Sequence, residues 1–305
     1  MASIKKQIIN LKKKSTDAMN KSKTWVLEAW DPQSMPIDAT ILIVGKRHTG
    51  KTVLTRALMY EMRKKLDVCM GMNPLERGNH NLSFFCPKAF VFDNFNDEKL
   101  GHLLAWQTCA MKNGKAHKIG FVMDDCASET TVASGGKRKK AMASADIGKL
   151  FKLGRHLKLF YINAMQDVKN APPDIRGNVD LLFAFNTNSG AERAKLHQEF
   201  FGMFSTFKNF NQVFDAGAQG YDCIVLDTRK AATDPEHCIM FYRAPLITEP
   251  FRVGREIFYK LSDYFFEDKN DYSMDPSRIL GLSSSDTPNF MVRKKQQHKE
   301  EEEEE

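Results

Sequence analysis

The sequence has little of what marks a membrane-spanning, secreted or zinc-binding protein. No run of about eighteen apolar residues occurs in its 305 residues, so we expect no transmembrane segment. The lysine-rich beginning lacks an apolar core and a small-residue cleavage site, so we expect no secretory signal. The six cysteines form no C-x-x-C pair, which predicts reduced, mostly buried thiols in a cytosolic compartment.

Charge is unevenly distributed along the chain. The formal net charge is +7, although the last six residues, Glu300–Glu305, are all acidic. Without them the chain has 45 basic and 32 acidic side chains, a charge of +13. A basic body with an acidic tail predicts a polyanionic partner, with which the tail competes for the basic surface; solubility alone is the alternative explanation.

Apolar runs alternate with helical periodicity over most of the chain, which predicts an α/β fold with a mostly parallel sheet sandwiched by helices. The expected strands are 40–44, 68–72, 88–92, 119–123, 157–163, 181–185, 221–227 and 238–242, the last two as a hairpin. The expected helices are 51–66, 97–111, 141–153 and 190–201. Ligands of such folds bind at the carboxyl ends of the strands.

Composition divides the chain into three parts. Residues 1–24 form a basic arm in which Ile4, Ile8 and Leu11 share a helical spacing, consistent with an amphipathic helix or a frayed arm. Residues 25–272 form the α/β domain. Residues 273–305, rich in Ser, Asp, Pro and then charge, are expected to be disordered.

A phosphate-binding loop follows the first predicted core strand. Gly45-Lys46-Arg47-His48-Thr49-Gly50-Lys51-Thr52 fits G-x-x-x-x-G-K-[ST] between a buried strand and a helix, as a P-loop requires. Glycines let the backbone wrap a phosphate, and the amide groups at the helix start favour an anion. We expect Lys51 to neutralise the β- and γ-phosphates of ATP and Thr52 to bind Mg²⁺.

Two carboxylates end the strand predicted at 119–123, as in a Walker B site. Asp124 is expected to hold Mg²⁺ and Asp125 to orient or deprotonate the attacking water. An aspartate that caps the next segment is the alternative interpretation of this pattern. Glu76 and Glu129 are substitute candidates for the base, although each is more typical of a surface charge.

Two further polar residues flank the strand predicted at 157–163. Gln166 follows it and is a candidate contact of the γ-phosphate or the water. Arg155 precedes it and is a candidate to reach the ATP of a neighbouring subunit. Taken alone, Gln166 is typical of a surface residue and Arg155 of an ordinary surface charge.

Together these residues resemble the FtsK/HerA-type branch of the additional-strand P-loop ATPases. The match is best to the DNA-packaging ATPases of large nucleocytoplasmic DNA viruses, poxviruses and giant viruses included. It is carried by Gly45–Thr52, Phe121–Asp125, Gly154-Arg155, Asn163–Gln166 and the run 171–180, over about residues 38–245. The Asp124-Asp125 pair, where many relatives have Asp-Glu, favours the poxvirus-like subgroup.

The resemblance implies an ATP-driven translocase that packages double-stranded viral DNA without sequence preference. It implies a trans-acting arginine at Arg155, a polar sensor at Gln166, and a homo-oligomeric ring, usually a hexamer. A capsid or membrane partner and a location in the host cytoplasm (viral factory) or the virion follow from the same resemblance. The basic loop Lys137–Lys140 is expected to be either a DNA-backbone contact or a solvated loop.

Other nucleotide-dependent functions remain as alternatives. A GTPase switch is disfavoured because Asn186-Thr187-Asn188 lacks the lysine and aspartate of N-K-x-D. A small-molecule kinase is disfavoured because arginines are sparse over residues 137–155, where a lid would need them. An ATP-binding scaffold is disfavoured because Lys51, Thr52, Asp124 and Asp125 are all present. No zinc finger, recognition helix or aromatic RNA motif is evident.

Overall fold

The computed structural model describes most of the region expected to form the α/β domain. The described residues are 7–11, 23–128, 130–132, 138–230 and 235–266. The tail predicted at 273–305, Glu129, Lys137 and most of the basic arm lie outside these residues. The chain divides into a unit Met1–Phe265 and a unit Phe266–Glu305, and every element below belongs to the first unit.

A ten-stranded sheet in the order β1-β2-β12-β11-β10-β3-β9-β6-β4-β5 forms the centre of the described part of the chain. Its strands are β1 (Gln7–Leu11), β2 (Lys23–Ala29), β3 (Thr40–Val44), β4 (Val68–Met72), β5 (Val91–Phe92), β6 (Ile119–Asp124), β9 (Leu159–Met165), β10 (Leu181–Phe185), β11 (Asp222–Asp227) and β12 (Ile239–Arg243). The core from β10 to β5 is parallel, whereas β11 is antiparallel to both β10 and β12. Strand β9 lies between β3 and β6, which confirms the additional-strand P-loop class.

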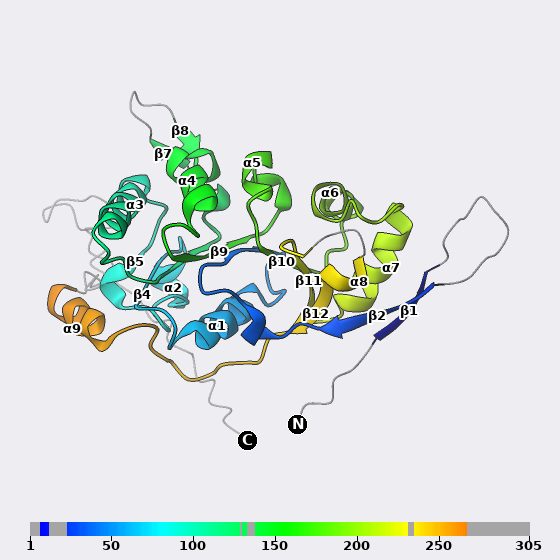
Figure 1. Ribbon diagram of the computed structural model, residues 1–305, viewed down its shortest axis with the longest axis horizontal. Helices are drawn as coiled ribbons and strands as arrows, with labels where there is room; N and C mark the ends of the chain where they lie inside the picture. The colour runs from blue at the N-terminus through cyan, green and yellow to red at the C-terminus, as the bar shows by residue number, and fades with distance from the viewer. Residues whose placement is uncertain (1–6, 12–22, 129, 133–137, 231–234, 267–305) are drawn as a thin grey trace, which may run out of the picture. The chain divides into compact units, whose positions relative to one another are not determined.

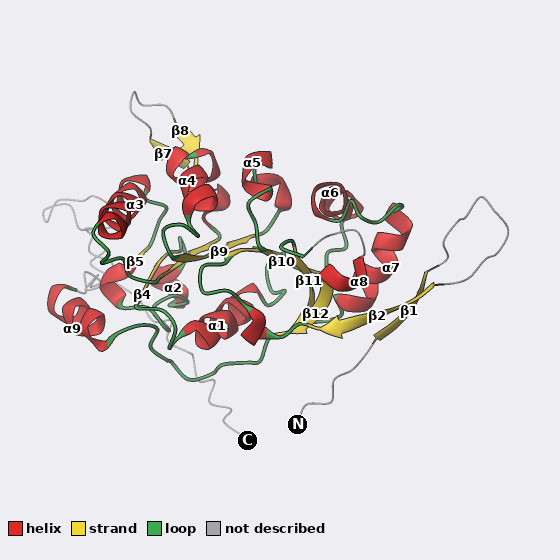
Figure 2. Cartoon of the chain, in the orientation of Figure 1, coloured by secondary structure: helices red, strands yellow, loops and turns green. Residues whose placement is uncertain are grey.

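Helices cover both faces of the sheet (Figures 1 and 2). They are α1 (Lys51–Met62), α2 (Glu76–Asn79), α3 (Asp97–Lys112), α4 (Ala145–Leu153), α5 (Pro173–Arg176), α6 (Gly190–Phe200), α7 (Phe207–Gly217), α8 (Pro235–Cys238) and α9 (Glu256–Phe265). Helices α3 to α7 lie above the sheet in Figure 1, and α1 lies below it. A short hairpin of β7 (Thr130–Val132) and β8 (Arg138–Lys140) forms a second sheet. No helix in the described ranges is both long and apolar enough to cross a bilayer.

The central strands are apolar throughout because both of their faces are buried. In β3, Leu42 and Val44 join the core beneath α3 to α7, while Ile41 and Ile43 join the core against α1. A parallel strand covered on both sides needs apolar residues at every position, which explains the unbroken run that predicted this strand.

Several predicted boundaries shift in the structure. Residues 7–11 form strand β1, paired antiparallel with β2, so the expectation of an amphipathic helix there is wrong. The strand predicted at 88–92 shrinks to β5 because Lys88–Phe90 form a 3-10 turn. The strand predicted at 157–163 is β9 and ends at Met165, so Gln166 follows it directly.

The cysteines also depart from expectation. Cys69 on β4 and Cys86 form a disulfide across a separation of 17 residues, with Cα atoms 5.3 Å apart. The other four cysteines are free thiols, and Cys109 is the exposed one among them. The prediction of six reduced thiols is therefore wrong for one pair, which becomes adjacent only when the segment after β4 folds back.

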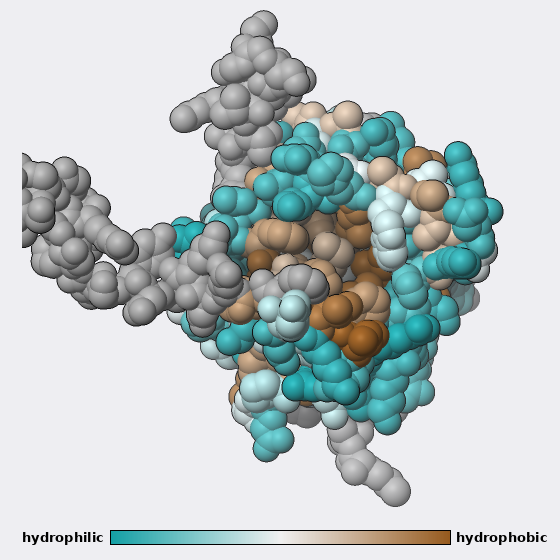
Figure 3. All heavy atoms as spheres, turned by 90° about the vertical axis from the view of Figure 1, so that its left-hand side faces the viewer, coloured by the Kyte–Doolittle hydropathy of each residue, from teal (hydrophilic) through white to brown (hydrophobic). Residues whose placement is uncertain are grey.

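An apolar surface lies at the β5 end of the sheet. Figure 3 views this end and shows apolar side chains gathered in a hollow with a hydrophilic rim. Exposed apolar side chains of this end include Ile257 and Leu261 on α9 and Trp106 on α3. A contiguous surface of this kind is typical of a contact with another protein chain.

Gln107 on α3 ties three segments together, and its replacement tests this part of the fold. It is fully buried, and its Nε2 donates to the carbonyl oxygens of His117 (2.5 Å) and Leu157 (2.7 Å), just before β6 and β9. Gln107→Leu should lower the free energy of unfolding by about 1–3 kcal/mol, because the buried Leu157 carbonyl and the part-buried His117 carbonyl lose their donor. Urea denaturation measures this; His102→Leu, at an exposed position of the same helix, is the control. Equal stability of the two variants would contradict the role of Gln107.

Candidate nucleotide-binding site

The loop Gly45–Thr52 connects β3 to α1 at the carboxyl edge of the sheet, as the motif predicts. Gly45 must be a glycine, since a Cβ there would lie 2.6 Å from Thr49 Oγ1 and 2.9 Å from Phe185 Cβ. Gly50 has φ 108° and precedes the first residue of α1. Both glycines are therefore needed by the backbone course of the loop itself.

The start of α1 offers amide donors to an anion. The first helical hydrogen bond at this end runs from the Leu54 N–H to the Gly50 carbonyl. The preceding amide groups of Lys51, Thr52 and Val53 have no acceptor within the helix. Together with the positive end of the helix dipole, they form a site suited to a phosphate group.

Lys51 is a buried cation held at the centre of the loop. Its side chain is 7% exposed, and Nζ donates to the carbonyl oxygens of Gly45 (2.8 Å) and Lys46 (3.1 Å). Nζ also lies 3.9 Å from Asp125 Oδ1. Lys46 instead pairs with Glu192 on α6 at 2.7 Å, and Arg47 and His48 are exposed. Lys51 is thus the loop cation that faces the carboxylates.

Asp125 connects Lys51 with Gln166. It follows β6 with φ 54°, and its N–H donates to the Ala164 carbonyl on β9 at 3.0 Å. Gln166 Nε2 donates to Asp125 Oδ2 at 3.1 Å. Asp125 Oδ1 is buried without a hydrogen-bond partner in the described structure, apart from its 3.9 Å approach to Lys51. Three residues predicted separately from the sequence therefore meet at one edge of the sheet.

Asp124 is buried beside this group. Burial, together with the charges of Asp125 and Glu76, raises the pKa of its carboxyl to about 6, although Lys51 and a hydrogen bond from Asn81 oppose the rise. Asn81 also accepts a hydrogen bond from Arg56 Nη2 on α1 at 3.2 Å. A buried carboxylate with so little compensation favours binding of a cation.

Glu76 is not the surface charge that the sequence suggested. It is buried, with one oxygen accepting from Ser83 N–H (2.8 Å) and the other from Leu82 N–H (2.9 Å) and Asn73 Nδ2 (3.2 Å). Because these donors occupy both oxygens, Glu76 is poorly placed to serve as the base. It holds the loop after β4 and adds negative charge beside Asp124.

The residues present fit Mg²⁺ and ATP. Thr52 offers a hydroxyl and Asp124 a carboxylate, and such oxygen ligands are the kind that Mg²⁺ binds. The partnerless Asp125 Oδ1 lacks a donor that a bound water or hydroxyl group would supply. The glycine-lined loop with its free amide groups suits a phosphate chain.

Arg155 lies away from this group. It forms an ion pair with Asp180, which precedes β10 and accepts from the Thr40 N–H at 2.8 Å. Thr40 begins β3, whereas the P-loop follows the end of β3. Arg155 is therefore at the opposite edge of the sheet from Lys51 of the same chain. Its side chain is 54% exposed.

The basic loop predicted at 137–140 is described only in part. Lys137 lies outside the described residues, and Arg138–Lys140 form strand β8 of the small hairpin. Lys140 is exposed. Its expected contact with DNA stays a prediction.

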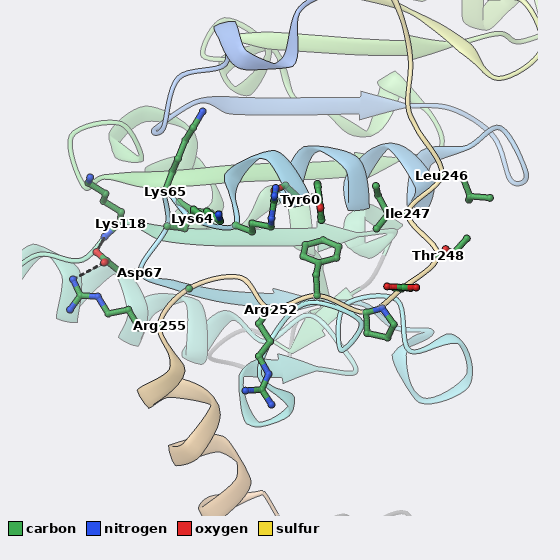
Figure 4. A pocket seen from close by; sticks show the side chains of 16 residues that line it. Tyr60, Lys64, Lys65, Asp67, Lys118, Leu246, Ile247, Thr248, Arg252 and Arg255 are labelled. Carbon is green, nitrogen blue, oxygen red and sulfur yellow. Dashed lines mark hydrogen bonds and ion pairs between the residues drawn. The ribbon is translucent and has the colours of Figure 1, made fainter. Parts of the chain in front are cut away.

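A pocket away from the P-loop opens on the described surface. It lies between the end of α1 and the segment 246–255, and it includes Lys64, Lys65, Lys118 and Arg252 (Figure 4). Asp67 at its edge pairs with Arg255 at 2.7 Å. This pocket is basic, but none of the predicted site residues lines it.

Comparison with known proteins places the chain among viral proteins. It is 30% identical over 205 residues to the uncharacterized protein 088R of Invertebrate iridescent virus 3, covering 67% of this chain and 75% of that protein. It is 26% identical over 286 residues to the uncharacterized protein L437 of Acanthamoeba polyphaga mimivirus, covering 88% and 96%. No protein-family model matches the chain.

A solved structure shares the fold. The genome packaging NTPase B204 of Sulfolobus turreted icosahedral virus 2, in complex with AMP, aligns with a TM-score of 0.52 and 16% identity, covering 70% of this chain and all of that one. Its complex with ATP-gammaS aligns with a TM-score of 0.50.

Removing the Asp124 charge should stabilise the metal-free protein at high pH only. The pKa of Asp124 is about 6 in the folded protein, above the ordinary 3.8. The folded state therefore loses stability as pH rises from about 4 to 6, because the unfolded chain gives up this proton more easily. In EDTA at pH 8, Asp124→Asn should gain about 1–3 kcal/mol in the free energy of unfolding, and almost nothing at pH 4. Asp263→Asn, at an exposed position of α9, is the control for denaturation at both pH values. A gain of equal size at pH 4 would contradict the burial account.

Proposed function

This chain belongs to the family of large-DNA-virus proteins that includes 088R of Invertebrate iridescent virus 3, and it has an FtsK/HerA-type P-loop fold. From these two findings we propose that it is an ATP-hydrolysing motor that packages double-stranded DNA. The observation that carries this proposal is the meeting of Lys51, Asp124, Asp125 and Gln166 at the carboxyl edge of the sheet. Such an arrangement has a phosphate-binding cation, a metal ligand and a candidate base within one site.

Each residue of the site has a separate role in hydrolysis. Lys51 leaves its carbonyl contacts to neutralise the phosphate charge, while the α1 amide groups hold the phosphate chain. Thr52 and Asp124 would hold Mg²⁺, which would supply positive charge at the phosphates. Asp125 accepts the proton of the attacking water through its unpartnered Oδ1.

Gln166 makes the site responsive to hydrolysis. Its side-chain amide holds Asp125 Oδ2 at 3.1 Å, and it follows β9 directly. A change at Asp125 is therefore passed to the segment after β9. We propose that this link couples hydrolysis to movement of the surfaces that contact DNA.

Arg155 completes the site of a neighbouring subunit. It is exposed and at the opposite edge from its own Lys51, so it can act only on another copy. Its ion pair with Asp180 would hold it until the subunits assemble. A closed homo-oligomeric ring, proposed as a hexamer, gives every subunit such a neighbour.

DNA is the proposed polymer because B204, which shares the fold, is a genome packaging NTPase and because the chain is basic. A motor that moves any sequence needs contacts to the phosphate backbone rather than to bases. A capsid or membrane partner and a location in the host cytoplasm or virion are proposed on the same grounds.

The first experiment measures ATP hydrolysis by the purified full chain with and without long double-stranded DNA. Turnover should rise with DNA, and Lys51→Ala should lower it at least about a hundredfold, since the phosphate loses its main cation. Lys64→Ala, in the basic pocket away from the P-loop, is the matched control and should keep turnover. Turnover that ignores DNA would instead favour a kinase or a switch.

The second experiment tests whether Arg155 acts in trans. Arg155→Ala alone and Lys51→Ala alone should each be inactive. Mixing the two should restore part of the turnover, because some interfaces then combine an intact Lys51 with an intact Arg155 from a different chain. Lys158→Ala, on the same surface turn, is the control and should be active alone. No recovery on mixing, with assembly verified by light scattering, would contradict the trans role.

A further inference from the structure

Tyr221 is an exposed aromatic ring beside the P-loop. It precedes β11, and its side chain is 67% exposed. The turn that carries it is well defined: Gly220 has φ 59°, and the Asp222 N–H donates to the Gln219 carbonyl at 2.9 Å. Asp222 also pairs with Arg243 on β12 at 2.6 Å. The ring is therefore exposed on a fixed backbone.

The ring lies against the loop that holds phosphate. A Cβ built on Gly50 would lie 3.6 Å from Tyr221 Cδ1 and 3.4 Å from the ring of Phe185. Phe185 is buried beneath the loop, whereas Tyr221 is open to solvent. Tyr221 thus borders the free surface of the P-loop at Gly50, the residue that precedes α1.

The strand order decides which end of a nucleotide would reach Tyr221. Asp125 and Gln166 follow β6 and β9, on one side of β3. Tyr221 precedes β11, which lies beyond β10 on the other side of β3. A triphosphate whose terminal phosphate faces Asp125 extends its other end, the ribose and base, toward the β10–β11 side.

We propose that Tyr221 stacks on the base of the bound nucleotide. An exposed ring on a rigid turn loses little conformational freedom when a base covers it, and base–aromatic stacking is a substantial and base-tolerant contribution to binding. This inference rests on the proposed function, since it assumes that the P-loop binds a nucleoside triphosphate. It adds a base-binding residue that the sequence motifs do not contain.

The test separates the base from the phosphates by using ATP and inorganic tripolyphosphate as probes in calorimetry. Tyr221→Ala should raise the Kd for ATP about tenfold, while Tyr221→Phe stays near the wild type because it keeps the ring. The Kd for tripolyphosphate should be unchanged in both variants. Tyr264→Ala, which removes an exposed tyrosine on α9, is the control and should bind both probes normally.

Two results would overturn the inference, and they differ from failure of the proposed function. If Lys51→Ala weakened ATP binding but Tyr221→Ala left it unchanged, the stacking inference would be contradicted and the proposed function would stand. An equal loss of ATP and tripolyphosphate in Tyr221→Ala would show that the ring supports the loop rather than the base. If the wild-type protein bound neither probe, or if Lys51→Ala had no effect, the proposed function would fail first and the stacking inference with it.

Discussion

The site depends on compensation of a buried positive charge. Lys51 is 7% exposed, so its ammonium group needs acceptors, and it has the Gly45 and Lys46 carbonyls and the nearby Asp125. Asp125 in turn is fixed by the Ala164 carbonyl and by Gln166, both at the end of β9. This chain of contacts is possible only because β9 lies between β3 and β6. The strand order therefore sets the chemistry of the carboxyl edge.

The two edges of the sheet carry different functional residues. The carboxyl edge holds the P-loop and the acidic pair, whereas the opposite edge holds Arg155, bound to Asp180. A single chain cannot bring Arg155 to its own Lys51 without unfolding the sheet between them. If the arginine takes part in hydrolysis, assembly must precede activity, which is the behaviour expected of a ring motor.

Much of this arrangement could be predicted from the sequence, because it follows from patterns within short segments of the chain. The buried strands have continuous apolar runs, and the P-loop and the Asp124-Asp125 pair follow two of them directly. What could not be predicted depends on contacts between distant segments. The buried state of Glu76, the Cys69–Cys86 disulfide and the approach of Tyr221 to Gly50 all arise from folding of loops that have no periodic signal. Strand β1 was missed because Ile4, Ile8 and Leu11 fit a helical spacing, whereas pairing with β2 determines the observed strand.

If hydrolysis at this site moves the protein along DNA, as proposed, displacement of a triplex-forming strand tests that movement most directly. A third strand bound far from the loading end of a long duplex is released only if a motor travels to it. We predict ATP-dependent release whose delay grows with the length of intervening duplex. Hydrolysis stimulated by DNA without any release would contradict translocation and leave a DNA-responsive ATPase in its place.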